Sequence, residues 1–199
     1  MNKYIVVVGN FGSGQDIIMR FLNKKFRRLK IVKELHHAPG DDFLSQMEIL
    51  GKLFKTVDTH SNFFKNQTFV LDNHPTFIQN CILPALHSLE HLNSREVKVY
   101  REWVKLIGTK IETRMIIHLK LNTNKCYDRL LNQNVVDVEF DTLFEIDRQM
   151  DFWVKNSISE PHITIDMNYF LELDFDERKE KELLRLLLKE FPSLEELRN

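Results

Sequence analysis

The sequence has few of the features that mark exported or membrane-bound proteins. Its 199 residues include only two cysteines, Cys81 and Cys126, which are too few for a framework of disulfide bonds. The apolar run near the N-terminus covers only residues 4–8 and has no cleavage region after it, and no stretch approaches the length that spans a bilayer. We therefore expect a cytoplasmic protein that neither enters a membrane nor is exported.

An excess of charge of either sign is also absent. The chain carries 28 basic and 29 acidic residues, so electrostatics favour neither nucleic acid nor a membrane surface as a partner. No stretch rich in proline, glycine and serine divides the chain, which has only five prolines and six glycines. A chain of this length can bury a sizeable core, so we predict a single domain over residues 1–199.

Three of the six glycines, Gly9, Gly12 and Gly14, lie close together near the N-terminus. They follow the β-branched run at residues 4–8 and precede a helical pattern at residues 17–22, which predicts a buried strand, a tight loop and a helix. In the motif G-x-x-x-x-G-K-[ST], such a loop closes backbone N–H groups around a phosphate. Gly9 and Gly14 have the spacing of that motif, with Asn10, Gly12 and Ser13 between them.

The positive charge of such a loop is missing. Gln15 stands in place of the lysine, and Asp16 stands in place of the hydroxyl that holds Mg²⁺. Gln15 can offer only a neutral amide, and the loss of one preorganised donor typically costs roughly 3–4 kcal/mol of transition-state stabilisation. Asp16 adds a negative charge in the first helical turn. We interpret Asp16 as a carboxylate that satisfies the helix dipole, with the alternative that it holds a divalent ion.

The rest of the chain alternates short apolar runs with helical patterns. Such alternation predicts an α/β fold with a parallel five-stranded sheet and helices on both faces. Ligands of these sheets bind at the carboxyl ends of the strands, so residues 9–16, Glu34, Asp72 and the segment after Leu121 should converge. The further strands are predicted at residues 29–33, 68–71, 114–121 and 162–166, and the further helices at residues 43–60, 77–92, 95–107, 123–131, 140–153 and 176–191.

The order of these pieces resembles that of the deoxynucleoside kinase family, especially the short bacterial deoxyadenosine/deoxyguanosine kinase type, over nearly the whole chain. The resemblance implies a P-loop kinase-like fold, ATP and Mg²⁺ as cofactors if the protein is active, and a homodimer or a heterodimer with a related kinase. A face of the helices between residues 77 and 107 would form the dimer contact. The matching pieces are GNFGSGQD, VKEL, DFLSQMEILGKLFK, FVLDNHPTF, LKLNTNKCYDRLL and PHITIDMNYF.

The resemblance also assigns roles to particular residues. Glu34 stands where the family has the general base for the 5′-hydroxyl of the nucleoside, and Gln46 stands where a glutamine binds the base through its amide. Asp72 matches an acidic residue that helps to hold Mg²⁺ in the family. An active kinase with an altered arrangement would hold the metal with Asp16 and Asp72 together. Each residue also has a structural interpretation: Glu34 as a solvated loop carboxylate, Gln46 as an amide that ties down backbone, and Asp72 as a turn former.

Most of the family's cations have no counterpart here. Asn73 and His74 replace the arginine and serine that follow the acidic residue in the family motif. Arg129 matches the arginine that opens the stretch leading to the family's lid, but residues 132–136 contain no arginine. Phosphoryl transfer depends on positioning and charge neutralisation, so several such losses should lower activity far more than one.

Three functions remain compatible with this sequence. The first is a kinase-like protein with a degraded ATP site that binds a nucleoside or nucleotide, or regulates a partner. The second is an active kinase that transfers the γ-phosphate of ATP to the 5′-hydroxyl of a deoxynucleoside. The third is a purely structural interaction scaffold.

Overall fold

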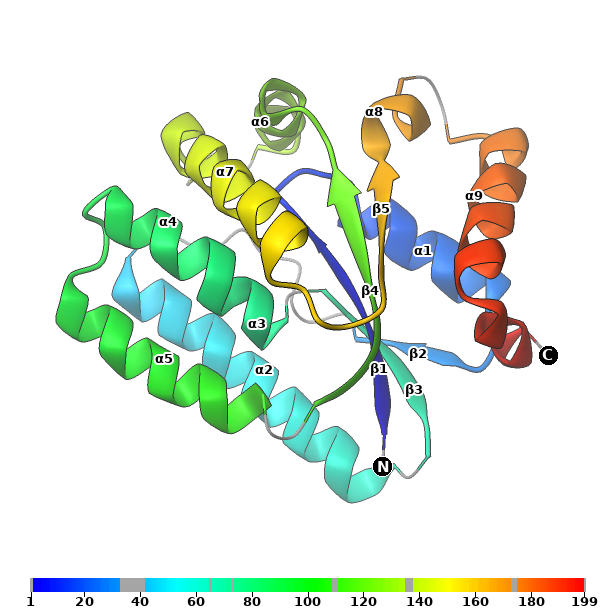
Figure 1. Cartoon of the computed structure of the whole chain (residues 1–199), viewed down its shortest axis with the longest axis horizontal. Coiled ribbons are helices and arrows are strands. Elements are labelled where there is room, and N and C mark those ends of the chain that lie inside the picture. The colour runs from blue at the N-terminus through cyan, green and yellow to red at the C-terminus, as the bar shows by residue number, and fades with distance from the viewer. Residues whose placement is uncertain are drawn as a thin grey trace.

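A five-stranded parallel sheet forms the centre of the computed structural model, which describes residues 2–32, 42–64, 66–72, 74–108, 111–134, 138–172 and 175–198 (Figure 1). The strands lie side by side in the order β2-β3-β1-β4-β5, and every neighbouring pair is parallel. This arrangement confirms the predicted α/β fold. The strands are β1 (Lys3–Gly9), β2 (Leu29–Ile31), β3 (Thr68–Asp72), β4 (Glu112–Lys120) and β5 (His162–Asp166).

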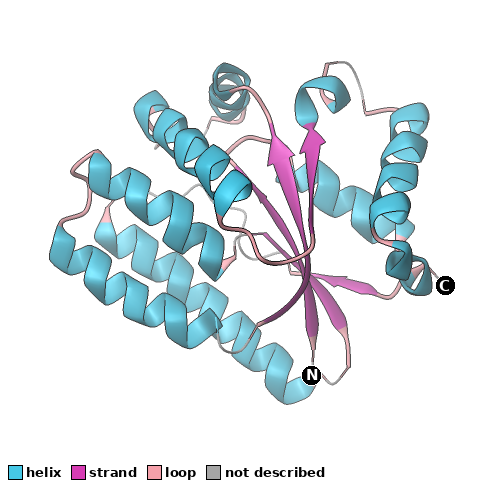
Figure 2. Cartoon of the chain, viewed as in Figure 1, coloured by secondary structure: helices cyan, strands magenta, loops and turns pink. Residues whose placement is uncertain are grey.

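Helices cover both faces of this sheet (Figure 2). A π-helical turn, η1, joins α3 to α4, and a short 3₁₀ helix, η2, follows α9. The helical elements are α1 (Gln15–Lys25), α2 (Phe43–Phe63), α3 (Pro75–Phe77), η1 (Ile78–Ile82), α4 (Leu83–Ser88), α5 (Ser94–Gly108), α6 (Thr123–Asn132), α7 (Phe140–Asn156), α8 (Met167–Phe170), α9 (Glu177–Glu190) and η2 (Pro192–Leu197).

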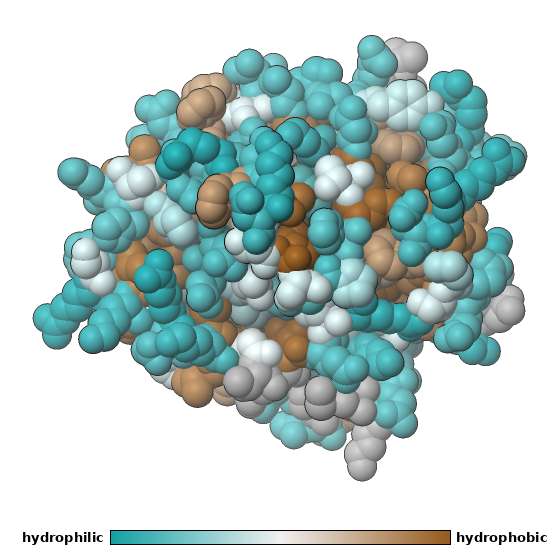
Figure 3. Space-filling model, viewed as in Figure 1, coloured by the Kyte–Doolittle hydropathy of each residue, from teal (hydrophilic) through white to brown (hydrophobic). Residues whose placement is uncertain are grey.

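Strand β1 lies in the middle of the sheet and is buried on both faces. Val6 and Val8 belong to a core cluster with residues of α2, α4, α5 and α7, whereas Ile5 and Val7 belong to a second cluster with residues of α1 and α9. A parallel strand between two helical layers needs apolar side chains in both directions, so its sequence is a continuous apolar run instead of an alternating one. Outside these two cores, the face seen in Figure 3 is mostly hydrophilic, with apolar side chains in scattered patches.

The helix predicted over residues 77–92 differs from the observed one. Helical structure starts at Pro75, passes through the π-helical turn η1 and ends at Ser88. His74 caps the start, because its Nδ1 accepts a hydrogen bond from the Thr76 N–H at 3.1 Å, and proline is favoured at the first helical position. Beyond the end, Glu90 has a left-handed backbone with φ of 62°, which breaks the helical pattern before residue 92.

Ion pairs fasten α9 to α1 on one face of the sheet. The Glu180 carboxylate of α9 lies 2.8 Å from the ammonium groups of both Lys24 and Lys25 at the end of α1. Hydrogen bonds from these two lysines hold the pKa of Glu180 below its usual range. Lys24 and Lys25 therefore help to hold α9 against α1.

Two buried histidines make the stability of the fold depend on pH. His74 Nε2 lies 2.8 Å from Thr113 Oγ1, and His118 Nδ1 lies 3.0 Å from Thr164 Oγ1. Burial lowers the pKa of His74 from 6.5 to about 4. Burial, together with the nearby Lys120 ammonium, lowers the pKa of His118 to about 4. Both rings are therefore neutral in the folded protein at pH 7.

Between pH 6.5 and 4 the unfolded chain binds protons at these histidines and the folded chain does not, so stability present above pH 6.5 is lost as the pH falls. We predict that each histidine lowers the free energy of unfolding by roughly 2 kcal/mol between pH 7 and pH 5. Urea denaturation at both pH values measures this loss. His118→Asn should show a smaller drop than the wild type, and substitution of the exposed His87 by Gln should leave the drop unchanged. An equal drop in wild type and His118→Asn would contradict the prediction.

Candidate functional site

The candidate site is the loop between β1 and α1, at the carboxyl edge of the sheet. Gly9 ends β1 and pairs in register with Leu119 of β4, while Val7 pairs with Asp72 at the end of β3. The loop therefore begins between the carboxyl ends of two neighbouring strands, where parallel sheets bind their ligands. This is the convergence that the sequence predicts for residues 9–16 and Asp72.

Two glycines give the loop its shape. Gly12 and Gly14 have φ values of 78° and 98°, a left-handed conformation that side chains other than glycine rarely adopt. A Cβ atom on Gly12 would lie 2.5 Å from the carbonyl oxygen of Cys126, so α6 also packs too closely to leave room for a side chain. Gly14 then starts α1 as its N-terminal cap. The loop thus has the backbone of a phosphate-binding loop.

Four backbone N–H groups of the loop remain available for an anion. The amides of Gly12, Gly14, Gln15 and Asp16 make no hydrogen bond with any part of the chain that the structure describes. Successive N–H groups in such a turn, at the start of a helix, form a concave site with positive potential. The backbone therefore fits a phosphate group.

The Gln15 side chain turns back into the loop. Its Nε2 donates to the carbonyl oxygens of Gly9 at 3.0 Å and Asn10 at 3.2 Å, and its Oε1 accepts from Ser13 Oγ at 3.0 Å. Ser13 is fully buried, so these bonds satisfy polar groups that water does not reach. Gln15 thus stabilises the loop but brings no charge to it.

Neighbouring helices hold the loop through two further side chains. Asn10 Nδ2 donates to the Leu143 carbonyl of α7 at 2.7 Å. Arg129 Nε, from α6, donates to the Gly12 carbonyl at 2.8 Å. The sequence offers no sign of the Asn10 contact, because the two residues are far apart in the chain. Arg129 was assigned to this region through the family resemblance, and the structure places it against the loop.

Asp16 lies between two arginines. Its carboxylate is 2.9 Å from the Arg20 guanidinium, one turn along α1, and 3.7 Å from that of Arg129. The spacing of four residues between Asp16 and Arg20 is a signal that the sequence does contain. These pairs support the structural interpretation of Asp16. They also occupy the carboxylate that a divalent ion would need, so the residues present fit an anion better than they fit Mg²⁺.

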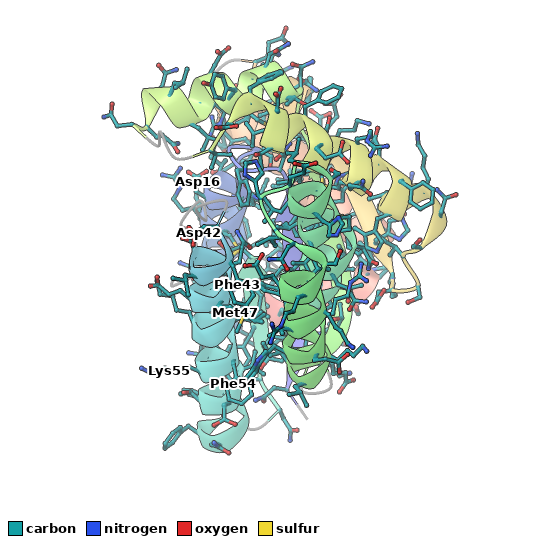
Figure 4. The ribbon with its side chains drawn as sticks, turned by 90° about the vertical axis from the view of Figure 1, so that its left-hand side faces the viewer. Asp16, Asp42, Phe43, Met47, Phe54 and Lys55 are labelled. Atoms are coloured by element: carbon teal, nitrogen blue, oxygen red, sulfur yellow. The ribbon has the colours of Figure 1, made fainter. Side chains whose placement is uncertain are left out.

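The other predicted site residues lie in different parts of the chain's structure. Asp72 is buried at the end of β3. Gln46 is buried in the second turn of α2, and its backbone carbonyl accepts from the Tyr100 hydroxyl at 3.1 Å. Figure 4 shows Asp16 beyond the N-terminal end of α2, where Asp42 is labelled, so α2 begins at the same end of the molecule as the loop. Glu34 lies outside the described residues.

His74 takes the place of a motif serine but serves the fold. As described above, Nδ1 accepts from Thr76 and Nε2 faces Thr113, which fixes a neutral ring with both nitrogens engaged. Burial prevents His74 from carrying a positive charge near pH 7. It therefore cannot replace the missing arginine as a cation, and Asn73 lies outside the described residues.

A partly buried carboxylate on α7 is a polar group that no sequence motif marks. Asp147 Oδ2, on α7, accepts from Thr123 Oγ1 at 3.1 Å, and Oδ1 is buried without a hydrogen-bond partner in the described ranges. Burial raises the pKa of Asp147. Lys120 forms an ion pair with Asp151 at 2.8 Å beside it. Across the residues that the structure describes, no three His, Cys, Asp or Glu side chains are grouped as a metal site.

Comparisons with known proteins identify the family and the fold. The sequence profile of the family "Deoxynucleoside kinase" matches residues 5–192. A structure of deoxyadenosine kinase from M. mycoides with the products dCMP and a flexible dCDP is similar, with a TM-score of 0.73 and 17% identity over 94% of this chain and 98% of that one. The same kinase with dATP has a TM-score of 0.71 and 16% identity over 94% and 99%.

A third structure of that kinase, with dCTP, has a TM-score of 0.71 and 16% identity over 94% of this chain and 98% of the kinase. At these identities the likeness establishes the fold alone. Among curated protein sequences, no relative of significant similarity is found. Within the described residues, no helix is both long and apolar enough to cross a membrane.

We predict that the hydrogen bonds of Gln15 stabilise the folded protein. Gln15→Ala leaves two carbonyls and the buried Ser13 hydroxyl without their partner, so we expect the free energy of unfolding to fall by about 1–3 kcal/mol. Asp16→Ala, at the next position, removes only exposed ion pairs and should cost less than about 1 kcal/mol. Urea denaturation measures both. Equal effects of the two substitutions would show that the Gln15 bonds do not stabilise the loop.

Proposed function

Because the chain belongs to the deoxynucleoside kinase family, we propose that it is a member that binds a nucleoside or nucleotide and has lost efficient phosphoryl transfer. The observation that carries this proposal is the position of Gln15. The side chain that replaces the loop lysine is bonded to Gly9, Asn10 and Ser13, so it neither carries positive charge nor points toward the place of a phosphate.

The charge balance around the loop supports the loss of transfer. In phosphoryl transfer, cations and Mg²⁺ stabilise the charge on the transferred group. The cation closest to the loop, Arg129, has its Nε on the Gly12 carbonyl and its terminal nitrogen near Asp16. Asp16 itself is paired with Arg20. The loop therefore offers backbone N–H groups to an anion without a free cation beside them in the described residues.

Ligand binding is the part of the family's function that we propose is kept. The related deoxyadenosine kinase structures hold deoxynucleotides such as dCMP, dATP and dCTP. In this chain, Gln46 provides a buried amide on α2, and the family resemblance gives Glu34 as a contact for the 5′-hydroxyl. A deoxynucleoside or its phosphate is therefore the ligand class that we propose, with Gln46 and Glu34 as its contacts.

A working kinase is the second candidate, and one observation favours it. The open amides of Gly12, Gly14, Gln15 and Asp16 are the groups that hold phosphates in active loops. In such an enzyme Asp72, with Asp16, would hold Mg²⁺. The engagement of Asp16 by Arg20 counts against this arrangement.

We also propose self-association, or association with a related kinase, through α5. Val99, Trp103 and Leu106 lie one turn apart along this helix and are 42%, 44% and 57% exposed. Apolar side chains at such spacing suit helix packing between two subunits. Light scattering should give a mass near twice that of the chain, and Trp103→Glu should shift it toward the monomer. A monomeric wild-type protein at tens of micromolar would contradict self-association.

Restoring the loop tests the loss of transfer. The double substitution Gln15→Lys and Asp16→Thr returns the cation and the hydroxyl of the working motif. We expect transfer from radiolabelled ATP to deoxynucleosides to be at least about 10²-fold faster than in the wild type, since one preorganised donor has an effect of this size. Gln15→Lys alone, which keeps Asp16, is the matched control and should recover less.

The outcome of this assay separates the candidates. A wild type that transfers phosphate as fast as the restored variant would overturn the proposal and establish a working kinase. If neither the wild type nor the restored variant transferred phosphate, the result would agree with the proposal. The loss of transfer would then also involve Asn73 and the lid stretch.

A further inference from the structure

A groove between α4 and α5 carries a surplus of positive charge. It encloses about 660 Å³ and is lined from α5 by Lys98, Arg101 and Lys105 and from α4 by His87. In Figure 1 the two helices lie together on the left, and in Figure 3 hydrophilic side chains stand out on that side of the same face. No residue of the β1–α1 loop takes part in the groove.

The three cations of α5 form a row. They are spaced by three and four residues, so they lie on one side of the helix, and the row spans about 10 Å along its axis. Lys105 pairs with Glu102 at 3.0 Å. Lys98 and Arg101 make no ion pair with any residue in the described ranges. One carboxylate therefore faces three cations in a chain whose net charge is only −1.

Folding does not account for this row. The side of α5 that packs into the core consists of Val97, Tyr100, Val104 and Ile107, so the cations contribute nothing to that contact. Lys98 and Arg101 lie in the middle of the helix, where its dipole gives them no advantage, and like charges at this spacing repel one another. An anionic partner would relieve the repulsion that the free protein carries.

We propose that the α4–α5 groove docks an acidic peptide segment of a protein partner. The charged side chains that line the groove are exposed to solvent, whereas a small ligand would need a site that buries most of its surface. A row of cations about 10 Å long matches several successive residues of a peptide chain. Arg101 can bind a carboxylate through two parallel hydrogen bonds, and Lys98 adds a point charge beside it.

Fluorescence anisotropy with a labelled hexaglutamate peptide tests the proposal. The full chain should bind the peptide at about 50 mM salt, and binding should weaken as salt screens the charges. The double substitution Lys98→Glu and Arg101→Glu should lower the affinity at least tenfold. Because reversal is severe, Lys98→Gln with Arg101→Gln serves as a second variant and should lower the affinity by a smaller factor.

The control reverses two charges elsewhere. Arg27→Glu with Lys30→Glu changes the net charge by the same amount in another basic hollow, beside the end of α1 and β2, and should leave the affinity within about twofold. Three results would overturn the proposal. The wild type could fail to bind the peptide, or the control variant could lose as much affinity as the Lys98→Glu, Arg101→Glu variant. The third is complete displacement of the peptide by inorganic tripolyphosphate at the same concentration as the peptide. The last result would assign the groove to a small anion.

Discussion

The site depends on one constraint, which is the tight turn of the chain between β1 and α1. The central strand ends at Gly9, and α1 begins at Gln15, so the chain must turn within a few residues at the carboxyl edge of the sheet. The turn leaves two carbonyls and the Ser13 hydroxyl directed inward, and the amide of Gln15 satisfies all three. An amide can both donate and accept, which a lysine cannot do. The residue at the position of the motif lysine therefore supplies the bonds that hold the loop in this shape.

The side chains around the loop also bond to other groups of the protein. Arg129 donates to the Gly12 carbonyl, Asp16 lies between Arg129 and Arg20, and the buried His74 stays neutral with both ring nitrogens engaged. Among the described residues, these side chains are thus engaged by other groups of the protein. Within the described part of the chain, the backbone amides of Gly12, Gly14, Gln15 and Asp16 stay open. These contacts are the basis of our proposal that the site binds an anion but does not transfer it efficiently.

Much of the fold follows from local patterns. The apolar run of β1 predicts a strand buried on both faces, and the alternation of strands and helices predicts the parallel sheet that the structure has. The π-helical turn η1 and the end of α4 at Ser88 were not predicted, because the apolar spacing continues through both. The apolar periodicity of a segment shows which side of a helix is buried. It does not show where tertiary packing ends or distorts the helix.

The site was predictable only in part. The glycines predict the loop, and the spacing of Asp16 and Arg20 is typical of an ion pair on a helix. The inward turn of Gln15 depends on the three-dimensional path of the loop, and the bond of Asn10 to the Leu143 carbonyl joins residues distant in the chain. His74 shows the same limit of prediction from sequence. A histidine can titrate near neutral pH or bind a metal, whereas in this structure His74 is buried and neutral, and its side chain caps α3.

Calorimetric titration of the wild-type protein tests the central claim most directly, with each of the four deoxynucleosides and, separately, with ATP and Mg²⁺. Binding of at least one deoxynucleoside, with no comparable heat for ATP and Mg²⁺, is the result that this account predicts. Tight binding of both ligands would contradict the loss of the ATP site. Absence of binding by any of them would contradict the retained nucleoside site.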